Sequence, residues 1–534
     1  MPDLPETPPH DAPDPSSDAP SADGPEQSAH AAQASHHARS ARPARPARRT
    51  VLTAAVPAAA TVVGLTALTA PRPASLGEPA GDERLASALA PHLRGHRRVA
   101  AILVEDGQAR VAGFGTGDDA ELEGSEFEIG SVSKTFTGAL LAVAVERGEL
   151  TTDTTVAEVL GTDAKGAAIA DVTLAELATH SSGLPRLASA AAGGGSILAG
   201  LLRKDPYRGR DGRQVIADAL DETPSGRGQH AYSNLAVALE GQLLATAAST
   251  DYATPLTERI LEPLGMTSTY APITAENLRQ TARRGHGTSG LRQGMWTMEG
   301  SAPAGGIRST PADMARYLTA MIDGSAPGAE AATEVLFEED GASSTAMNWF
   351  LEDFGGGQPI TWHNGMTGGY ASFVGWDPSS GRGLALADGH RPLSRRARGG
   401  RAHRGGGAVN ALLSLLPPLV AAVLAVALVV TIVQIWTRYQ HPVRLALQAV
   451  GAAALMGVIG LAGLLPDALW WVSWAFTLAI LLGIAFSARR LLVGTPPSDP
   501  SPRKAESLDP PPRDSALIEV LFWLALVIVA LIAG

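Results

Sequence analysis

The longest apolar patterns of the chain lie in its C-terminal quarter and near its start. Four stretches are apolar over a length close to that of a bilayer-crossing helix and contain almost no charges: about 411–436, 445–465, 468–487 and 516–533. Another apolar run, to about Ala70, follows Arg48-Arg49-Thr-Val-Leu52 and resembles a twin-arginine signal. We therefore predict four transmembrane helices over 409–534, and an export signal or membrane anchor over 50–74.

Between about 80 and 390 the pattern is that of a folded α+β domain. Val99–Val104 and Ala109–Phe114 are predicted strands, joined by the hairpin signal Asp106-Gly107. Further strands are predicted at Ile360–His363, Tyr370–Trp376 and Leu384–Ala387, and helices near Arg84–Leu93, Gln214–Leu220, Leu235–Ala247 and Ala312–Ile322. Strands at both ends predict one antiparallel sheet in which the N- and C-terminal strands meet, with helices packed on it.

Two segments have no periodic pattern. Residues 1–49 are rich in Pro, Ala, Ser, Asp and His without aromatics, which predicts a disordered tail rather than a histidine metal site. Residues 391–408 are rich in Arg and Gly and read as a flexible basic tether. Either contact with anionic head groups or a plain solvated linker would explain this tether.

Charge predicts the membrane topology and limits the partners. If the 80–390 domain lies outside the cytoplasm, Arg438, Arg444, Arg489, Arg490 and the basic residues of the 495–514 loop lie inside, as the positive-inside rule requires. The Arg-rich tether is the exception, since it would lie outside. The net charge of −11 argues against nucleic acid as a partner. The chain has no cysteine, which excludes disulfides, thiol catalysis and cysteine-ligated metals. We expect no metal and no cofactor.

The first candidate for chemistry is Phe127–Lys134. It leads into a predicted helix that is apolar on nearly every side to Val145, with a C-cap at Gly148. Ser131 and Lys134 are three residues apart and share one face of its first turn. A lysine entering a dry core must be paired or lose its proton. A neutral lysine beside a serine hydroxyl is a nucleophile with its base, the S-x-x-K arrangement of penicillin-recognising acyl-transfer enzymes.

Two later motifs each allow a catalytic and a structural interpretation. Tyr232-Ser-Asn234 offers a phenol whose pKa a nearby lysine ammonium would lower, or a tyrosine packed at a helix start. His363-Asn-Gly365, followed by Met366, offers a strand edge that a substrate backbone can approach, or a turn with a chance histidine. With an ordinary pKa of about 6.5, His363 would be available near neutrality as an imidazole or as a cation.

Taken together, these motifs resemble one family. Phe127–Gly138 is similar to the first motif of class C β-lactamases and of the related D-alanyl-D-alanine carboxypeptidases, D-aminopeptidases and esterases of the serine β-lactamase-like superfamily. Tyr232–Asn234 resembles the Y-x-N motif of that family, and His363–Gly365 the H-x-G variant of its third motif. The resemblance covers about 84–390. It implies a β-lactamase/transpeptidase-like α+β fold, with an antiparallel sheet, helices on both faces and a helical subdomain.

The resemblance also implies roles for the residues of the first two motifs. Ser131 would be the nucleophile, and Lys134 with Tyr232 would move its proton. Asn234 would hold a substrate amide or Lys134 itself. The backbone N–H groups of Ser131 and Met366 would form the oxyanion hole.

The third motif departs from the class C pattern. His363 stands where class C β-lactamases keep a lysine, so a fixed cation for the carboxylate of an antibiotic is missing. With Gly365 at the substrate-binding strand, this departure favours the peptidase and esterase branches.

Two hypotheses about function follow. The favoured one is a multi-pass cell-membrane serine hydrolase with an extracytoplasmic catalytic domain, acting on small peptides, esters or β-lactams through a Ser131 acyl-enzyme. The alternative is a receptor domain that senses penicillin or peptidoglycan fragments, with slow deacylation coupled to the membrane helices. Besides the substrate, membrane lipid and a membrane protein partner are expected at the spans.

Overall fold

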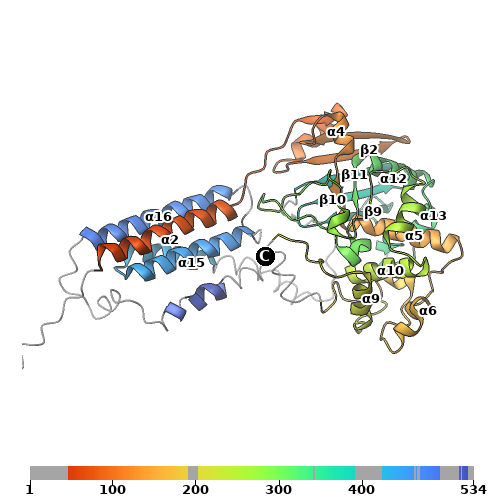
Figure 1. The fold of residues 1–534 in the computed structure, drawn as a ribbon. Helices are drawn as coiled ribbons and strands as arrows, with labels where there is room; N and C mark the ends of the chain where they lie inside the picture. The colour runs from red at the N-terminus through yellow and green to blue at the C-terminus, as the bar shows by residue number, and fades with distance from the viewer. Residues whose placement is uncertain are drawn as a thin grey trace, which may run out of the picture.

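The computed structural model describes residues 46–190, 203–340, 343–390, 424–461, 465, 469–493, 516–518 and 520–526. In these ranges an α+β domain lies at one end and a bundle of apolar helices at the other (Figure 1). The predicted tail, apart from residues 46–49, and the predicted tether at 391–408 lie outside the described residues.

The main sheet of the described domain has nine antiparallel strands in the order β1-β3-β2-β11-β10-β9-β8-β7-β6. Their bounds are β1 Pro79–Gly81, β2 Val99–Glu105, β3 Gln108–Phe114, β6 Phe337–Asp340, β7 Ser343–Thr345, β8 Phe350–Glu352, β9 Ile360–Met366, β10 Ala371–Asp377 and β11 Arg382–Asp388.

The predicted hairpin and the predicted meeting of the two ends of the sheet are both confirmed. The hairpin joins β2 to β3, and Asp106 and Gly107 both have positive φ (53° and 72°), as its two-residue turn requires. β11 pairs with β2, so that Asp388 lies opposite Val99. The first and last strands of the predicted sheet therefore lie side by side in its interior.

Nine short helices of the described domain accompany this sheet. They are α3 Glu83–Leu89, α4 Asp119–Gly124, α5 Ser133–Glu146, α6 Val156–Leu160, α7 Leu174–Ala178, α9 Gly212–Leu220, α10 Asn234–Ala247, α12 Pro311–Asp323 and α13 Ala329–Thr333, with α11 Ala253–Leu256 a single turn. The helices predicted near 214–220, 235–247 and 312–322 are α9, α10 and α12. The nucleophile helix α5 ends as predicted, with Gly148 at φ 67°.

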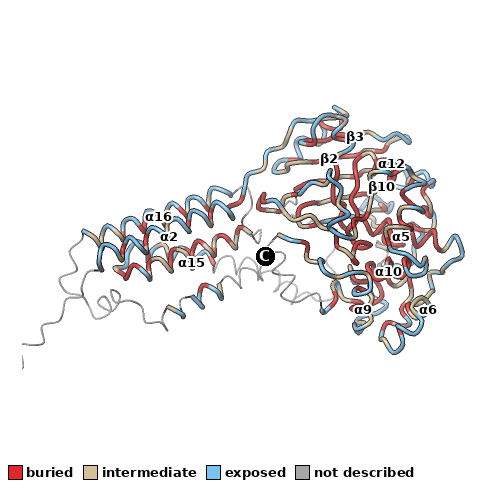
Figure 2. The backbone as a smooth tube through the Cα atoms, in the orientation of Figure 1, coloured by how far each residue is buried: buried red, intermediate tan, exposed pale blue. Residues whose placement is uncertain are grey.

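Alternation along β2 divides the domain into layers on the two faces of the sheet. Val99 and Ala101 pack with α3 on one face. Ile102 and Val104 face the main core, which also contains the buried residues of α5, α10 and α12. Figure 2 shows α5 and α10 buried over most of their length. The predicted α+β fold with helices on both faces of an antiparallel sheet is therefore confirmed.

Several strands were not predicted. β6, β7 and β8 extend one edge of the sheet, and β4 (Phe127–Glu128) pairs with β5 (Arg308–Ser309) in a separate two-stranded sheet. Each has two to four residues, too few to show a period-2 pattern. The small sheet matters for function because β4 directly precedes the turn that carries Ser131.

Three described helices are long and apolar enough to cross a membrane: α2 Arg48–Thr69, α15 Pro442–Leu461 and α16 Trp470–Val493. α15 and α16 occupy the predicted stretches 445–465 and 468–487. A shorter apolar helix covers Leu424–Thr437, and residues within 516–526 are helical. These two stretches continue into residues that the structure does not describe, so four C-terminal spans stay a prediction.

α2 belongs to the same bundle as the C-terminal helices. The Thr66 and Thr477 hydroxyls lie 2.5 Å apart, joining α2 to α16. A Cβ on Gly460 of α15 would lie 2.7 Å from the Thr69 carbonyl oxygen, so these helices are in backbone contact. Val51 packs on Leu491 at the opposite end of α2. α2 therefore runs parallel to α15 and antiparallel to α16.

Candidate active site

The nucleophile turn is pressed directly against the edge of β9. Gly130 has φ 51°, and a Cβ there would lie 2.7 Å from the Met366 nitrogen. A Cβ on Gly365 would lie 2.1 Å from the Ile129 carbonyl oxygen and 2.9 Å from the Ser131 nitrogen. Glycine is required at both positions because no side chain fits between the two backbones. The backbone nitrogens of Ser131 and Met366 therefore lie on the two segments that face each other in this contact.

Lys134 is fully buried one helical turn after Ser131. Its Nζ lies 3.1 Å from Ser131 Oγ, 2.9 Å from Asn234 Oδ1 and 2.5 Å from the Ala304 carbonyl oxygen. Burial lowers the pKa of Lys134 well below its usual value, and the charge of Arg186 lowers it further. The site therefore disfavours the ammonium form of Lys134 and favours the amine beside the serine hydroxyl.

Tyr232 and Asn234 reach Ser131 and Lys134 from the start of α10. The residue between them is the N-cap: Ser233 Oγ accepts from the Ala236 N–H at 2.9 Å and donates to the Pro185 carbonyl at 2.7 Å. This cap fixes the phenol just before the helix and the amide in its first turn. Asn234 bonds to Lys134, one of the two alternatives expected for it.

Tyr232 hydrogen-bonds to Ser131, and its ring lies 5.0 Å from Lys134 Nζ. Desolvation raises the pKa of Tyr232 to about 12, outweighing the hydrogen bond with Ser131 and the charge of Arg186. The expected lowering of this pKa is therefore wrong. The phenol is an O–H group at neutral pH, suited to passing a proton rather than to acting as a phenolate base.

His363 lies under the strand edge rather than on it. Its side chain is fully buried, and Nδ1 donates to the Asn364 carbonyl at 2.6 Å. The ring stacks on Phe350 and lies 6.4 Å from the Tyr232 ring. Burial and then the charge of Lys134 lower the pKa of His363 to about 3. The expectation that a cationic His363 is accessible near neutrality is therefore wrong, because the imidazole is neutral there.

Two ionisable side chains next to the site, His180 and Glu240, are not among the site residues predicted from the sequence. His180 lies 4.5 Å ring to ring from Tyr232, and its Nδ1 accepts from the Ser233 N–H at 3.3 Å. Glu240 is fully buried in α10. The signal for Glu240 was available, since it is the only charged residue in the apolar run Leu235–Leu244.

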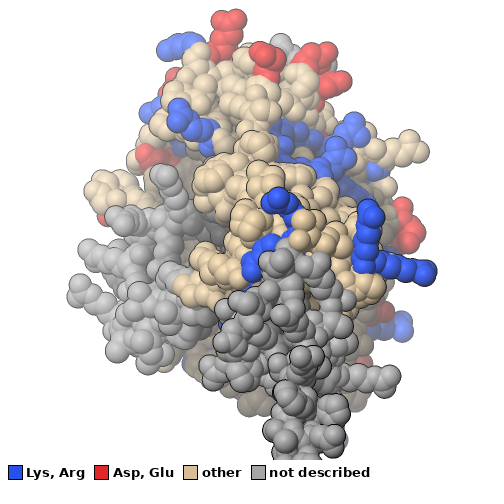
Figure 3. All heavy atoms as spheres, turned by 90° about the vertical axis from the view of Figure 1, so that its left-hand side faces the viewer, with Lys and Arg blue, Asp and Glu red and all other residues tan. Residues whose placement is uncertain are grey.

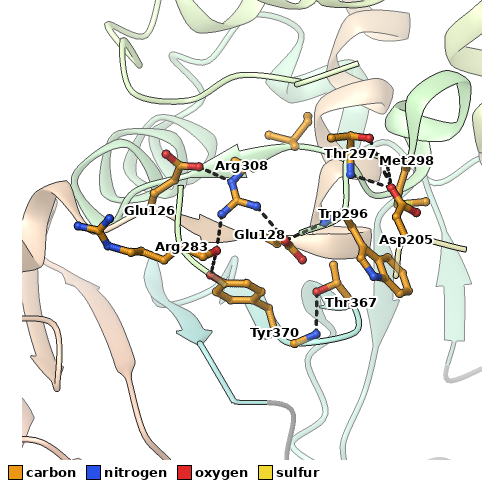
Figure 4. A network of polar contacts seen from close by, with 12 residues as sticks. Glu126, Glu128, Asp205, Arg283, Trp296, Thr297, Met298, Arg308, Thr367 and Tyr370 are labelled. Atoms are coloured by element: carbon orange, nitrogen blue, oxygen red, sulfur yellow. Dashed lines mark hydrogen bonds and ion pairs between the residues drawn. The ribbon is translucent and has the colours of Figure 1, made fainter. Parts of the chain in front are cut away.

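A buried ion network holds the segment before the nucleophile turn (Figure 4). Arg308 on β5 is fully buried, bonds to Glu126, and donates to Glu128 at 2.8 Å. Glu128 also accepts from the Trp296 N–H at 3.0 Å. Because all three charges are buried and paired, they fix β4 against β5. The start of the Ser131 turn is therefore held by the pairing of β4 with β5.

A cavity of about 90 Å³ opens beside Asn234. Its walls are mostly apolar and aromatic, with the Arg210–Asp218 ion pair on one side; they include Leu187, Tyr207, Val215, Leu235 and Trp296. Tyr207 OH accepts from Asn234 Nδ2 at 3.1 Å, which joins this wall to the site. Within the described residues, no group of three or more His, Asp or Glu side chains could hold a metal ion.

A serine, a buried lysine and a tyrosine gathered beside one strand of an antiparallel sheet are the arrangement of the serine acyl-transfer proteins that recognise penicillin. Comparison with known proteins agrees. A sequence model of the family described as Beta-lactamase matches residues 85–403. The chain belongs to this β-lactamase family.

The chain is also similar to individual proteins. It is 29% identical to penicillin-binding protein 4 of Amycolatopsis lactamdurans, over 49% of this chain and 71% of that protein. It is 31% identical to the D-alanyl-D-alanine-carboxypeptidase/endopeptidase AmpH of Escherichia coli (strain K12), over 28% of this chain and 35% of that protein. Among solved structures, the D-alanine carboxypeptidase AmpC from Burkholderia cenocepacia matches 58% of this chain and 93% of that chain, at 24% identity and a TM-score of 0.48.

Proposed function

We propose that the protein is a membrane-bound serine hydrolase with an extracytoplasmic catalytic domain. It would act through a Ser131 acyl-enzyme on amide or ester substrates, namely D-amino-acid peptides, esters or β-lactams. The observation that carries this proposal is the 3.1 Å contact between Ser131 Oγ and the buried Nζ of Lys134. The proposal also draws on the relatives named as penicillin-binding protein and carboxypeptidase.

The chemistry assigned to these side chains is two-step acyl transfer. Neutral Lys134 accepts the Ser131 proton while Oγ attacks the substrate carbonyl carbon. The resulting ammonium, through the Tyr232 hydroxyl, returns a proton to the departing amine or alcohol as its bond to the carbonyl carbon breaks. Water then attacks the ester formed on Ser131 and gives its proton to Lys134 along the same path. As the bond between Ser131 Oγ and the carbonyl carbon breaks, Lys134 returns this proton to Oγ, and the acid is released.

The oxyanion of both steps is assigned to the backbone N–H groups of Ser131 and Met366. Support comes from the close approach of the Gly130 turn to β9, which brings both nitrogens to the same edge. Fixed donors of this kind typically contribute about 10²–10³-fold to the rate.

His363 and the cavity beside Asn234 bear on the choice of substrate. A neutral, buried imidazole cannot serve as the cation that binds a substrate carboxylate, so His363 is assigned the bracing of Tyr232 at the strand edge. Arg186 is exposed and lies 5.2 Å from the centre of the Tyr232 ring. We assign to its guanidinium the binding of a negatively charged substrate group. The apolar wall of the cavity suits an acyl side chain.

The membrane arrangement is supported by charge. α2 begins with Arg48 and Arg49, Arg489 and Arg490 lie near the C-terminal end of α16, and Arg444 lies in the first turn of α15. These basic residues share the end of the bundle that lies away from the catalytic domain, and Figure 3 shows basic side chains on the molecule seen from that side. A cytoplasmic location of this end satisfies the positive-inside rule.

A neutral fluorophosphonate probe tests the nucleophile. The full chain in detergent should be labelled with one probe per molecule, and Ser131→Ala should not be labelled. Chasing a penicillin adduct then separates enzyme from sensor: turnover within minutes supports the hydrolase, and persistence for hours supports the receptor hypothesis. Equal labelling of Ser131→Ala would reject both.

A further inference from the structure

α10 carries an ionisable side chain that the proposed chemistry does not use. Glu240 is fully buried in a helix whose neighbouring residues are apolar. Its two carboxyl oxygens accept from Asn348 Nδ2 at 3.2 and 2.9 Å. Burying a charged carboxylate beside the neutral Asn348 amide costs free energy, so the surroundings of Glu240 favour its uncharged form.

The partner of Glu240 is held in place by its own turn. Asn348 has φ 61°, and its N–H donates to the Ala178 carbonyl at 3.1 Å. The preceding Met347 carbonyl oxygen lies 2.0 Å from where a Cβ on Gly138 would be, so this turn touches α5. Gly138 is one helical turn beyond Lys134, on the same side of α5. Glu240 therefore lies where α5, α10 and this turn meet.

Glu240 and Lys134 act on each other electrostatically. After burial, the charges that act on Lys134 are those of Arg186, which lowers its pKa, and Glu240, which raises it. Burial raises the pKa of Glu240 to about 8, while Asn348 and the charge of Lys134 oppose this rise. Among the other titratable groups of the described residues, Tyr252 interacts with Glu240, whereas His180 and His363 interact with Lys134.

We propose that Glu240 is a positioning residue for the proton on Lys134 and so sets the pH range in which Ser131 is acylated. This inference rests on the proposed serine hydrolase function. The two side chains share one proton over part of the pH range, either as ammonium and carboxylate or as amine and carboxylic acid. Only the amine can take the Ser131 proton. The carboxyl therefore divides the enzyme between a resting form and a reactive form.

Replacing the charge should change the pH profile in one direction. In Glu240→Gln, no carboxylate stabilises the ammonium, so the pKa of Lys134 falls. The rise of the acylation rate with pH should become a single ionisation and move to lower pH by about one unit. Well below the midpoint, labelling relative to the plateau should be about tenfold faster than in wild type.

Two further variants serve as controls: one should move the midpoint of the pH profile in the opposite direction, and the other should not move it. Arg186→Gln removes the charge that lowers the pKa of Lys134, so its acid limb should move to higher pH. Glu149→Gln makes the same change of charge beyond the far end of α5, where Glu149 pairs with Arg259, and should leave the midpoint unchanged. A purely structural role of Glu240 would alter the plateau or the melting temperature but not the midpoint.

The measurement is the second-order rate of Ser131 labelling by the fluorophosphonate between pH 5 and 9, on the full chain in detergent. If Glu240→Gln does not fold, Asn348→Gly replaces it. Glycine accepts the positive φ, and loss of the donor disfavours the carboxylate, so its midpoint must also fall. A midpoint equal to wild type in either folded variant overturns the proposal. Labelling that survives Ser131→Ala rejects the proposed function instead, so the two failures are distinguishable.

Discussion

At the scale of single residues, the site is governed by the burial of its ionisable groups. Lys134, Glu240 and His363 are all fully buried, and for each of them burial is the largest cause of the pKa shift. In each case burial favours the uncharged form. Burial therefore favours the amine of Lys134, the carboxylic acid of Glu240 and the neutral imidazole of His363.

Burial of neutral His363 predicts a stability loss in acid. Its folded pKa is about 3, against about 6.5 in an unfolded chain. Below pH 6.5 the unfolded chain therefore binds a proton that the folded chain excludes, so stability falls as the pH falls through 6.5. At pH 5.5 the buried His363 lowers the free energy of unfolding by about 1.4 kcal/mol relative to neutral pH. This destabilisation vanishes above about pH 7.5.

His363→Asn should remove that destabilisation. The variant should therefore lose less melting temperature than wild type between pH 7.5 and 5.5, measured on the full chain in detergent. His92→Asn, at an exposed histidine, is the matched control and should behave like wild type. An equal loss in wild type and His363→Asn would show that His363 is protonated in the folded protein.

At the scale of elements, the decisive contact is between β9 and the nucleophile turn. Gly365→Ala would place a methyl group 2.1 Å from the Ile129 carbonyl oxygen, so the strand must move away from the turn. Since the Met366 N–H moves with it, we expect acylation to slow by at least about 10²-fold, the typical effect of one lost oxyanion donor.

Gly356→Ala is the control for this change, because no atom lies within 4 Å of its added methyl group. Both variants should retain the wild-type circular dichroism spectrum, and stopped-flow labelling measures the rates. Wild-type acylation by Gly365→Ala would exclude β9 from the oxyanion site.

Some helices and turns of the domain could be predicted from the sequence, and some contacts between elements could not. The hairpin Asp106-Gly107 and helices α9, α10 and α12 could be predicted because their turn residues and apolar spacing are local signals. The buried state of His363 could not be predicted, because it depends on Phe350 and Tyr232, which come from other elements. The same holds for Asn348 beside Glu240, a contact across 108 residues of sequence.

At the scale of the whole molecule, the catalytic domain is tied to the bundle at both of its ends. α2 precedes it, while α15 and α16 follow it, and all three pack together. In the sequence, the apolar run after Arg48 allows either an export signal or an uncleaved membrane anchor. The packing of Val62 and Thr66 of α2 in the bundle, with Thr66 bonded to Thr477, favours the anchor.

We therefore predict that the N-terminal segment stays on the mature protein. A chain with an epitope tag upstream of Arg48 and a second tag at its C-terminus should give one membrane-bound band that carries both tags. Loss of the upstream tag from the folded, active protein would show that α2 is removed.

The central claim is that Ser131, activated by Lys134, is the residue that becomes acylated. Peptide mass mapping of the full chain after reaction with a penicillin tests it most directly. The account predicts one adduct, on the peptide that contains Ser131, and a rate of formation at least about 10³-fold lower in Lys134→Ala, comparable to the loss of a catalytic base. An adduct on any other residue, or an unchanged rate in Lys134→Ala, would contradict it.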